Sequence, residues 1–210
     1  MAVSEDEVAG EFEWREVTTE CREVRASARG EEVRCLVNRE TIRSTITGRA
    51  VTRLIVRHPG ISVMVPFTSA GEIVLIRQYR YAVGAELWEL PAGTLDGREE
   101  GGRVIPTETA ERCAARELRE ETGYEAAEWE EVAAYFAVPG ASDEVAHVFF
   151  ARGLRRGVPA LEEGEAIREV RAFGAPELER MIARGDIRDA KTLVGLLYAL
   201  ARRPTGMSIS

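Results

Sequence analysis

Three glutamates lie close together in one stretch of the sequence, at spacings that could hold a metal ion. Glu117, Glu120 and Glu121 stand at positions i, i+3 and i+4, and residues at these spacings share one face of an α-helix. Carboxylate oxygens are the ligands that Mg²⁺ takes from proteins, and the ion keeps water and substrate phosphates in the rest of its shell. A solvated acidic face, offset by the neighbouring Arg116, would have the same spacing. The spacing alone leaves both interpretations open.

The helix that would carry these glutamates is well marked. Residues 108–122 have a narrow apolar stripe at steps of three and four, formed by Ala110, Cys113, Ala114 and Leu118. Gly123 follows directly and suits the left-handed conformation that ends many helices. The pattern therefore predicts a helix over residues 108–122.

The wider sequence resembles the Nudix box, and the match is long. The box runs glycine, five residues, Glu, seven residues, then Arg-Glu-hydrophobic-any-Glu-Glu-any-Gly-hydrophobic, and residues 102–124 match every fixed position. In the sugar-nucleotide branch of this family, the box glycine belongs to a Leu-Pro-Ala-Gly turn, here residues 90–93. Glu108 lies 15 residues after Gly93, where the family has six, so nine residues are inserted. We interpret Gly93 as the box glycine.

The inserted segment is rich in glycine and charge, which is typical of a loop. Residues 97–107 contain Gly101-Gly102 and Pro106 and are predicted to form a surface loop that shapes the entrance to the site without carrying the chemistry.

Further stretches resemble the ADP-ribose pyrophosphatase branch of the family. They are IRQYR, LWELPAG and VPGASDE, at residues 76–80, 87–93 and 138–144. Residues 185–197 are similar to the closing helix of that branch, with Asp189, Lys191 and Thr192 in place. The resemblance covers residues 58–203.

The resemblance implies attack of water on a phosphorus of a nucleoside diphosphate sugar, with Mg²⁺ as cofactor and Mn²⁺ as a substitute. ADP-ribose, giving AMP and ribose 5-phosphate, is the leading substrate. Glu117, Glu120, Glu121 and the backbone carbonyl of Ala92 would ligate the metal, and Glu120 counts among the catalytic residues as well. Glu144 would be the other catalytic residue.

Glu144 would act as the base that deprotonates the water, and its neighbour Asp143 competes for this role. Three residues are candidates for substrate binding: Arg80 on a phosphate or the terminal ribose, Glu89 on the sugar or metal-bound water, and Arg53. Plain structural roles compete with these assignments. Glu144 could be an exposed turn residue, and Arg80 and Glu89 could simply pair with each other.

Charge and cysteine content limit the partners. A net charge of −8 and a pI near 5.1 argue against nucleic acid and anionic membranes, because both are bound by clustered Lys and Arg. The expected partner is a small nucleoside diphosphate sugar whose charge a divalent cation offsets. Three widely spaced cysteines and an acidic N-terminus without a signal sequence indicate a reducing, cytoplasmic location. The two histidines, His58 and His147, lack metal-ligand spacing and are interpreted as surface or structural residues.

The predicted fold is α/β, a Nudix-type α/β/α sandwich with a mixed sheet over residues 58–210. Residues 1–57 are predicted to form a strand-rich appendage that mediates a homodimer. Strands are expected at 61–67 and 72–80, joined by a hairpin-like TSAG turn, and at 132–138, 145–151 and 166–173, with helices at 176–185 and 189–203.

Two alternative functions fit the same motifs. The box reads only the diphosphate, so hydrolysis of GDP-mannose or another nucleoside diphosphate sugar is the first alternative. A non-catalytic sensor that binds ADP-ribose is the second. The intact Glu117, Glu120 and Glu121 favour catalysis over sensing.

Overall fold

The computed structural model describes residues 12–27, 30–157 and 167–202. The chain divides into two compact units. The first consists of Met1–Pro59, Asp96–Thr107 and Phe136–Val145, and the second of Gly60–Leu95, Glu108–Tyr135 and Ala146–Ser210. The first unit thus contains two later segments in addition to the N-terminal residues that the sequence assigned to an appendage.

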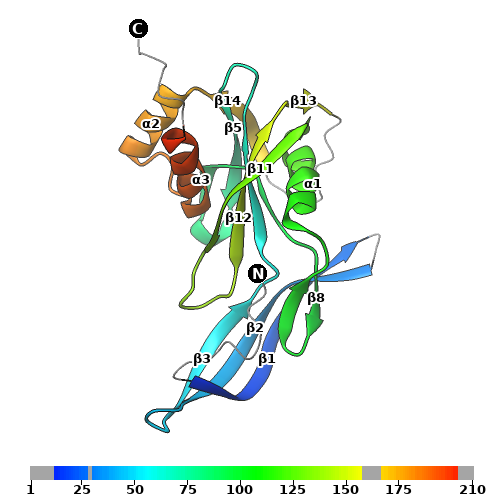
Figure 1. Cartoon of the computed structure of the whole chain (residues 1–210), viewed down its shortest axis with the longest axis vertical. Helices are drawn as coiled ribbons and strands as arrows, with labels where there is room; N and C mark the ends of the chain where they lie inside the picture. Colours follow the sequence, from blue (N-terminus) through cyan, green and yellow to red (C-terminus); the bar gives the residue numbers. More distant parts are fainter. Residues whose placement is uncertain (1–11, 28–29, 158–166, 203–210) are drawn as a thin grey trace. The chain divides into compact units, whose positions relative to one another are not determined.

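A three-stranded antiparallel sheet forms most of the first unit (Figure 1). Its strands, in the order β1-β2-β3, are Phe12–Ser27, Gly30–Ser44 and Ala50–Arg57. Valine and threonine recur in all three strands, and β-branched residues of this kind pack well on a pleated surface. The predicted N-terminal strands are therefore present.

The predicted loop at 97–107 is wrong, because this segment forms a β-hairpin. Strand β8 (Gly97–Glu100) pairs antiparallel with β9 (Arg103–Pro106). Between them Gly101 and Gly102 have φ values of 58° and 75°. Two successive positive φ values are typical of a type I′ turn, whose twist matches that of paired strands and which glycine adopts without strain.

This hairpin packs against β2. Val104 of β9 lies with Val33 and Leu36 of β2 in a small buried apolar cluster. The side chain of Asn38 donates to the carbonyl oxygen of Gly102 at 2.7 Å. The insertion therefore contributes to the core of the first unit, contrary to the expectation that it would lie at the surface as a loop.

Two sheets form the centre of the second unit. The strand order is β11-β12-β4-β7 in one sheet and β14-β5-β6 in the other. The first sheet is mixed, since β12 is parallel and β7 antiparallel to β4. The strands are β4 Ile61–Pro66, β5 Ile73–Arg80, β6 Ala85–Glu89, β7 Ala92–Thr94, β11 Glu128–Phe136, β12 Val145–Arg152 and β14 Ile167–Phe173. A short 3₁₀ turn, Tyr81–Val83, links β5 to β6, and β10 (Tyr124–Glu125) pairs with β13 (Arg155–Arg156).

The expected hairpin between β4 and β5 is not formed. A tight turn is present, with the N–H of Thr68 donating to the carbonyl of Glu72 at 2.9 Å. Only Phe67 and Ile73 bridge across it, however, and β4 and β5 then enter different sheets. The turn was predicted correctly, and the pairing of its flanking strands was not.

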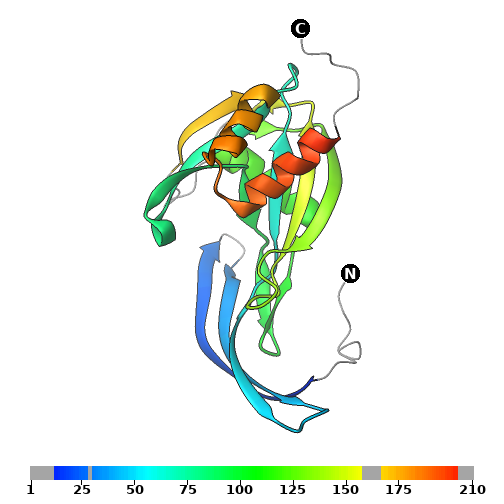
Figure 2. The ribbon, with the colours of Figure 1, turned by 90° about the vertical axis from the view of Figure 1, so that its left-hand side faces the viewer.

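Helices cover both faces of the mixed sheet (Figure 1). They are α1 (Ala110–Thr122), α2 (Ala175–Arg184) and α3 (Ala190–Ala201). Figure 2 shows α2 and α3 next to each other, in orange and red. Among the described helices, none has the length and apolar content needed to cross a bilayer.

Alternation along the central strands explains this layering. Val63 and Val65 of β4 join the apolar cluster beneath α2 and α3, whereas Met64 between them joins the cluster beneath α1. Val148 and Phe149 of β12 divide in the same way. Successive side chains of a strand point to opposite faces, so a strand buried on both faces is apolar throughout. The unit is an α/β/α sandwich.

Candidate active site

Helix α1 carries the three glutamates, and specific residues fix both of its ends. The hydroxyl oxygen of Thr109 accepts from the N–H of Arg112 at 3.3 Å and caps the start of the helix. Gly123 has a φ of 69° and ends the helix, its N–H donating to the carbonyl of Arg119 at 2.9 Å. The predicted helix and its glycine stop are confirmed.

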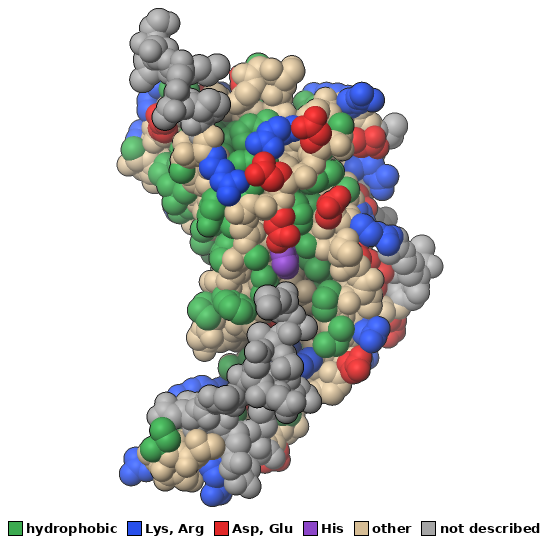
Figure 3. Space-filling model, viewed as in Figure 1, with side chains coloured by type: hydrophobic (Ala, Val, Ile, Leu, Met, Phe, Trp, Pro, Cys, Tyr) green, Lys and Arg blue, Asp and Glu red, His purple; other side chains and the backbone are tan. Residues whose placement is uncertain are grey.

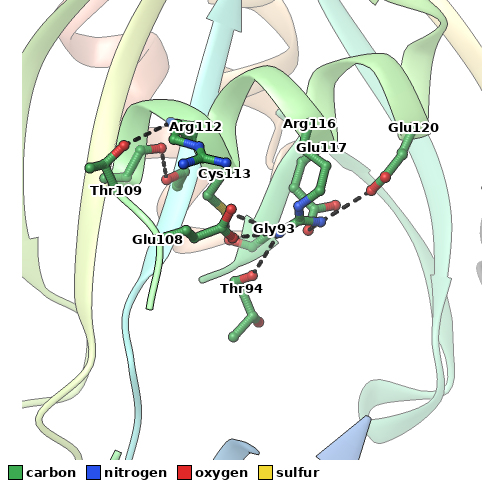
Figure 4. A network of polar contacts seen from close by, with 11 residues as sticks. Gly93, Thr94, Glu108, Thr109, Arg112, Cys113, Arg116, Glu117 and Glu120 are labelled. Carbon is green, nitrogen blue, oxygen red and sulfur yellow. Dashed lines mark hydrogen bonds and ion pairs between the residues drawn. The ribbon is translucent and has the colours of Figure 1, made fainter. Parts of the chain in front are cut away.

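Arg116 lies among the acidic residues of this helix (Figure 4). Its Nη1 is 2.6 Å from Oε1 of Glu117 and 3.1 Å from Oε2 of Glu120, and its Nη2 is 2.8 Å from Oε1 of Glu108. Burial alone would lower the pKa of Arg116, but the charge of Glu117 and the hydrogen bond to Glu108 outweigh it and raise the pKa. One guanidinium charge is therefore shared among three carboxylates.

The Leu-Pro-Ala-Gly turn meets the same face of α1. The N–H of Ala92 donates to Oε2 of Glu121 at 2.9 Å. A Cβ at Gly93 would overlap the side chain of Glu117, so a larger residue there would displace this carboxylate. Glu117 and Glu121 are only 4% and 3% exposed. These contacts support Gly93 as the box glycine, because Gly102 lies in the turn of the β8–β9 hairpin.

The chemistry of this group fits a divalent cation. Glu117, Glu120 and Glu121 offer hard carboxylate oxygens next to the Ala92 peptide, and Mg²⁺ prefers such ligands. In the part of the chain that the structure describes, no three acidic, histidine or cysteine side chains form a ready-made metal site. Two of the glutamates turn toward Arg116 and the third toward the Ala92 N–H. Binding a cation therefore requires these side chains to rotate.

Arg80 and Glu89, two of the predicted substrate-binding residues, form a two-pronged ion pair. Nε and Nη2 of Arg80 donate to Oε1 and Oε2 of Glu89 at 2.8 and 2.7 Å. Glu89 is 1% exposed, and the side chain of Arg80 is 40% exposed. The hydrogen bond to Glu89 raises the pKa of Arg80, and the charge of Glu121 acts in the same direction. Arg80 therefore lies in the electrostatic field of the box.

A second partner of Glu89 had no role assigned from the sequence. Nζ of Lys191 in α3 also contacts Oε2 of Glu89 and lies 3.0 Å from Oδ2 of Asp189. Burial alone would raise the pKa of Glu89, but the hydrogen bond from Arg80 and the charge of Lys191 outweigh it, so the pKa is lowered. The GDIRDAKT stretch, similar to the closing helix of the branch, was the available signal. Nothing local shows which residue Lys191 reaches.

The first unit holds the remaining candidates, and there Asp143 is part of a structural network. Its Oδ2 accepts from Nη1 of Arg57 at 3.0 Å, and its Oδ1 accepts from the N–H of His58 at 2.9 Å. Arg57 also forms two hydrogen bonds, of 2.9 and 2.7 Å, to the buried carboxylate of Glu40. Burial alone would lower the pKa of Arg57, but these hydrogen bonds raise it. Both oxygens of Asp143 thus hold the chain around residues 57 and 58.

Glu144 has a different neighbour, since its Oε2 lies 3.7 Å from Nδ1 of His58. Burial lowers the pKa of His58 to about 4, and the charge of Arg34 adds to this. His58 is therefore neutral at pH 7, and the contact is not an ion pair. The sequence identified His58 only as a surface or structural residue, and the structure places it beside the candidate base.

Arg53 lies on β3 with an exposed side chain, and Nη1 donates to the carbonyl of Thr52 at 3.4 Å. Glu144 and Arg53 belong to the first unit, whereas Arg80, Glu89, Ala92 and the box glutamates belong to the second. Acidic and basic side chains are interspersed on the visible face of the molecule (Figure 3).

Comparison with known proteins gives consistent results. The NUDIX domain matches residues 56–194. An ADP-ribose pyrophosphatase of Mycobacterium tuberculosis is 37% identical over 151 residues, which is 71% of this chain and 69% of that protein. A GDP-mannose pyrophosphatase of Escherichia coli is 32% identical over 151 residues, 68% of this chain and 73% of that protein. A crystal structure of an ADP compounds hydrolase has a TM-score of 0.64 at 18% identity, covering 90% of this chain and 95% of that one, and so shows the same fold.

The family match and the structural neighbour confirm both the predicted fold class and the resemblance on which it was based. The residues that carried the resemblance are also the ones that meet in space, since the turn at Ala92 and Gly93 contacts Glu117 and Glu121. This chain is a member of the Nudix family and belongs to its ADP-ribose pyrophosphatase-like branch.

Proposed function

We propose that this Nudix pyrophosphatase hydrolyses ADP-ribose to AMP and ribose 5-phosphate with the help of Mg²⁺. The observation that carries the proposal is the Arg80–Glu89 pair. It joins two of the stretches that resemble the ADP-ribose branch, IRQYR and LWELPAG, and Arg80 lies within the field of Glu121. Similarity to an ADP-ribose pyrophosphatase at 37% identity supports the same substrate.

Glu117, Glu120, Glu121 and the Ala92 carbonyl are the groups that would hold the metal. A bound divalent cation neutralises phosphate charge and makes water a stronger nucleophile. The protein residues supply the rest of the site. Arg116 bridges Glu117 and Glu120, and Gly93 lets the turn approach Glu117.

Arg80 is proposed to bind a phosphate of the diphosphate. Two of its nitrogens are held by Glu89, and Nη1 has no hydrogen-bond partner among the described residues. A guanidinium fixed along one edge presents its other edge in a defined direction, which suits recognition of a phosphate oxygen. Glu89 would then act by orienting Arg80. Arg53 remains a proposed substrate contact.

Glu144 is proposed as the base that removes a proton from the attacking water. The competing candidate, Asp143, uses both carboxylate oxygens to hold Arg57 and the His58 N–H. Glu144 faces a neutral imidazole instead. A carboxylate with both oxygens engaged by protein donors is less available to accept a proton from water. The pattern of contacts therefore favours Glu144.

The test is a panel of nucleoside diphosphate sugars assayed with Mg²⁺, with products separated by chromatography. We expect AMP and ribose 5-phosphate from ADP-ribose, with kcat/KM at least about tenfold above that for GDP-mannose. A preference for GDP-mannose would replace the proposal by its first alternative, which similarity to the E. coli enzyme supports. Binding of ADP-ribose without hydrolysis under any metal condition would indicate a sensor.

Two further properties are proposed, a cellular location and an oligomeric state. A cytoplasmic location is supported by the absence of disulfides among Cys21, Cys35 and Cys113. A homodimer formed through the N-terminal sheet is supported by its exposed apolar side chains, Val17 on β1, Leu54 on β3 and Ile46 in the turn between β2 and β3.

A further inference from the structure

Lys191 stands out in this chain because it is the only lysine. Lysine and arginine together number 28, and every other member of this set is arginine. The two side chains differ physically, since an ammonium is a compact point charge and a guanidinium is a planar fork. A lone lysine in such a sequence therefore marks a position with a particular requirement.

The place of Lys191 in its helix is unfavourable. Asp189 caps α3, its Oδ2 accepting from the N–H of Thr192 at 3.0 Å, so Lys191 lies in the first helical turn. The helix dipole favours negative charge at this end and opposes a cation. The contact with Asp189, at 3.0 Å, offsets part of this cost. Helix stability alone does not explain a lysine here.

Helix α3 is also firmly attached to the Leu-Pro-Ala-Gly turn. The hydroxyl of Thr192, completely buried, accepts from the N–H of Leu90 at 2.8 Å. A Cβ at Gly195 would overlap the side chain of Leu90, so the helix and the turn lie in close contact. The backbone at Lys191 is therefore fixed relative to the strand end that bears Glu89.

Both Arg80 and Lys191 contact the carboxylate of Glu89. It receives two hydrogen bonds from Arg80 and a contact from Lys191 on Oε2. Arg80 already engages both oxygens of this carboxylate, and Lys191, which also pairs with Asp189, adds a contact to one of them from a different element. With Lys191 holding Oε2 from the helix side, the plane of the carboxylate cannot rotate freely, and the fork of Arg80 must follow it.

We propose that Lys191 is a positioning residue for substrate binding, which acts through Glu89 on Arg80. It holds the Glu89 carboxylate in one orientation, so that Nη1 of Arg80 points toward the bound diphosphate. Its side chain is 15% exposed, and it reaches the substrate only through this chain of contacts. The proposal rests on the proposed function, in which Arg80 binds a phosphate.

A double-mutant cycle between Lys191 and Glu89 tests this role. Lys191→Met keeps the length of the side chain and removes its charge, and Glu89→Gln removes the carboxylate charge and one of the two acceptors that hold Arg80. Lys191→Met alone should raise KM for ADP-ribose about tenfold while kcat changes less than about threefold. In the Glu89→Gln background the same substitution should raise KM less than about twofold, because effects transmitted through one group are not additive.

A matched control is available on the same pair of strands. Arg77 on β5 pairs with Glu86 on β6 at 2.9 Å, and the two side chains are 45% and 35% exposed. Arg77→Met removes one cation from an ion pair in the same way and should leave KM and kcat unchanged. Equal losses from Lys191→Met in both backgrounds would show direct contact with substrate and overturn the proposal, as would an unchanged KM.

A second measurement does not depend on turnover or on the stability of any variant at Lys191. Labelling with ¹⁵N-lysine gives a side-chain ammonium signal from Lys191 alone. Adding the non-hydrolysable α,β-methylene analogue of ADP-ribose should shift this signal in the wild-type chain and leave it in place in Arg80→Ala. No shift in the wild-type chain, despite binding seen by calorimetry, would overturn the proposal. Absence of binding and hydrolysis with ADP-ribose would instead refute the proposed function, and the same cycle would then use the best substrate from the panel.

Discussion

Asp143 and Glu144 are neighbours in the chain, but their carboxylates have different surroundings. Asp143 accepts from the Arg57 guanidinium at 3.0 Å and from the His58 N–H at 2.9 Å, whereas Glu144 lies 3.7 Å from the imidazole of His58. A carboxylate with both oxygens engaged by the protein serves the structure. Its neighbour, next to a neutral ring, is the better candidate for chemistry.

Matched amide substitutions should separate the two roles. Glu144→Gln should lower kcat by about a hundredfold to ten-thousandfold, the contribution typical of a general base, with little change in stability. Asp143→Asn should lower the free energy of unfolding by about 1–2 kcal/mol, because it weakens a charged hydrogen bond to Arg57. Steady-state kinetics and urea denaturation of both variants are the measurements. The reverse pattern would assign the base to Asp143.

His58 should make the first unit sensitive to acid. Its pKa is lowered from 6.5 to about 4 by burial and by Arg34, against the opposing charges of Asp143 and Glu23. Between these two pH values the unfolded chain binds a proton that the folded chain does not, so stability rises with pH across this window. The contribution is fully present above about pH 6.5 and is lost toward pH 4, by on the order of 2 kcal/mol.

Urea denaturation at pH 7 and pH 4.5 measures this effect. His58→Gln should lose less stability between the two pH values than the wild-type chain does. The same substitution at His147, which contacts Glu131 in β11 at 2.7 Å, controls for the loss of a histidine in general. Identical acid sensitivity in His58→Gln and the wild-type chain would show that other groups cause it.

Removing charge from the box should abolish turnover and leave the fold intact. In Glu121→Gln the amide oxygen can still accept from the Ala92 N–H, and in Glu117→Gln it can still accept from Arg116. Both variants should lose at least about a thousandfold in kcat, since each removes a charge that would face the metal. Circular dichroism checks the fold, and addition of EDTA to the wild-type chain should stop the reaction. Full activity in EDTA, or unfolding of both variants, would contradict the metal role.

Local patterns in the sequence were enough to predict α1, because its apolar stripe and Gly123 lie within one short segment. The β8–β9 hairpin was missed although a signal was present. Gly101-Gly102 between two short runs is a known hairpin turn, but only Val104 and Ile105 mark the flanking strand as apolar. The many glycines and charged residues of the segment indicated a loop more strongly than the diglycine indicated a hairpin.

The contacts that build the site join residues far apart in the sequence, and local sequence patterns do not predict such contacts. Glu89 and Lys191 are 102 residues apart in sequence and meet only because α3 packs on the Leu-Pro-Ala-Gly turn. For the same reason no local pattern indicates that β4 and β5 enter different sheets, because their partners β12 and β14 come much later in the chain. Resemblance to a family identified the residues, and packing determined which of them touch.

The N-terminal sheet should form a dimer through its exposed apolar side chains. Leu54 on β3 is 58% exposed, and Val17 and Ile46 are exposed as well. We expect light scattering to give twice the chain mass of 23.2 kDa, and Leu54→Asp to shift the mass toward that of one chain, because a buried charge opposes association. Leu197→Asp on α3, where the leucine is also 58% exposed, is the matched control. A mass of one chain for the wild-type protein would exclude the dimer.

The β8–β9 hairpin should matter for stability and leave catalysis almost unchanged. Val104 is 6% exposed and packs on Val33 and Leu36, so Val104→Ala should lower the free energy of unfolding by about 1–2 kcal/mol. Ile105→Ala, on the less buried side of the same strand, should cost less.

Replacing the hairpin by a short linker between Leu95 and Glu108 should destabilise the first unit further, because Asn38 also loses the Gly102 carbonyl. In that variant kcat should stay within about tenfold, a barrier change of about 1.4 kcal/mol. A loss of turnover as large as that of Glu121→Gln, in a variant that still folds and binds Mg²⁺, would show that the hairpin belongs to the catalytic apparatus.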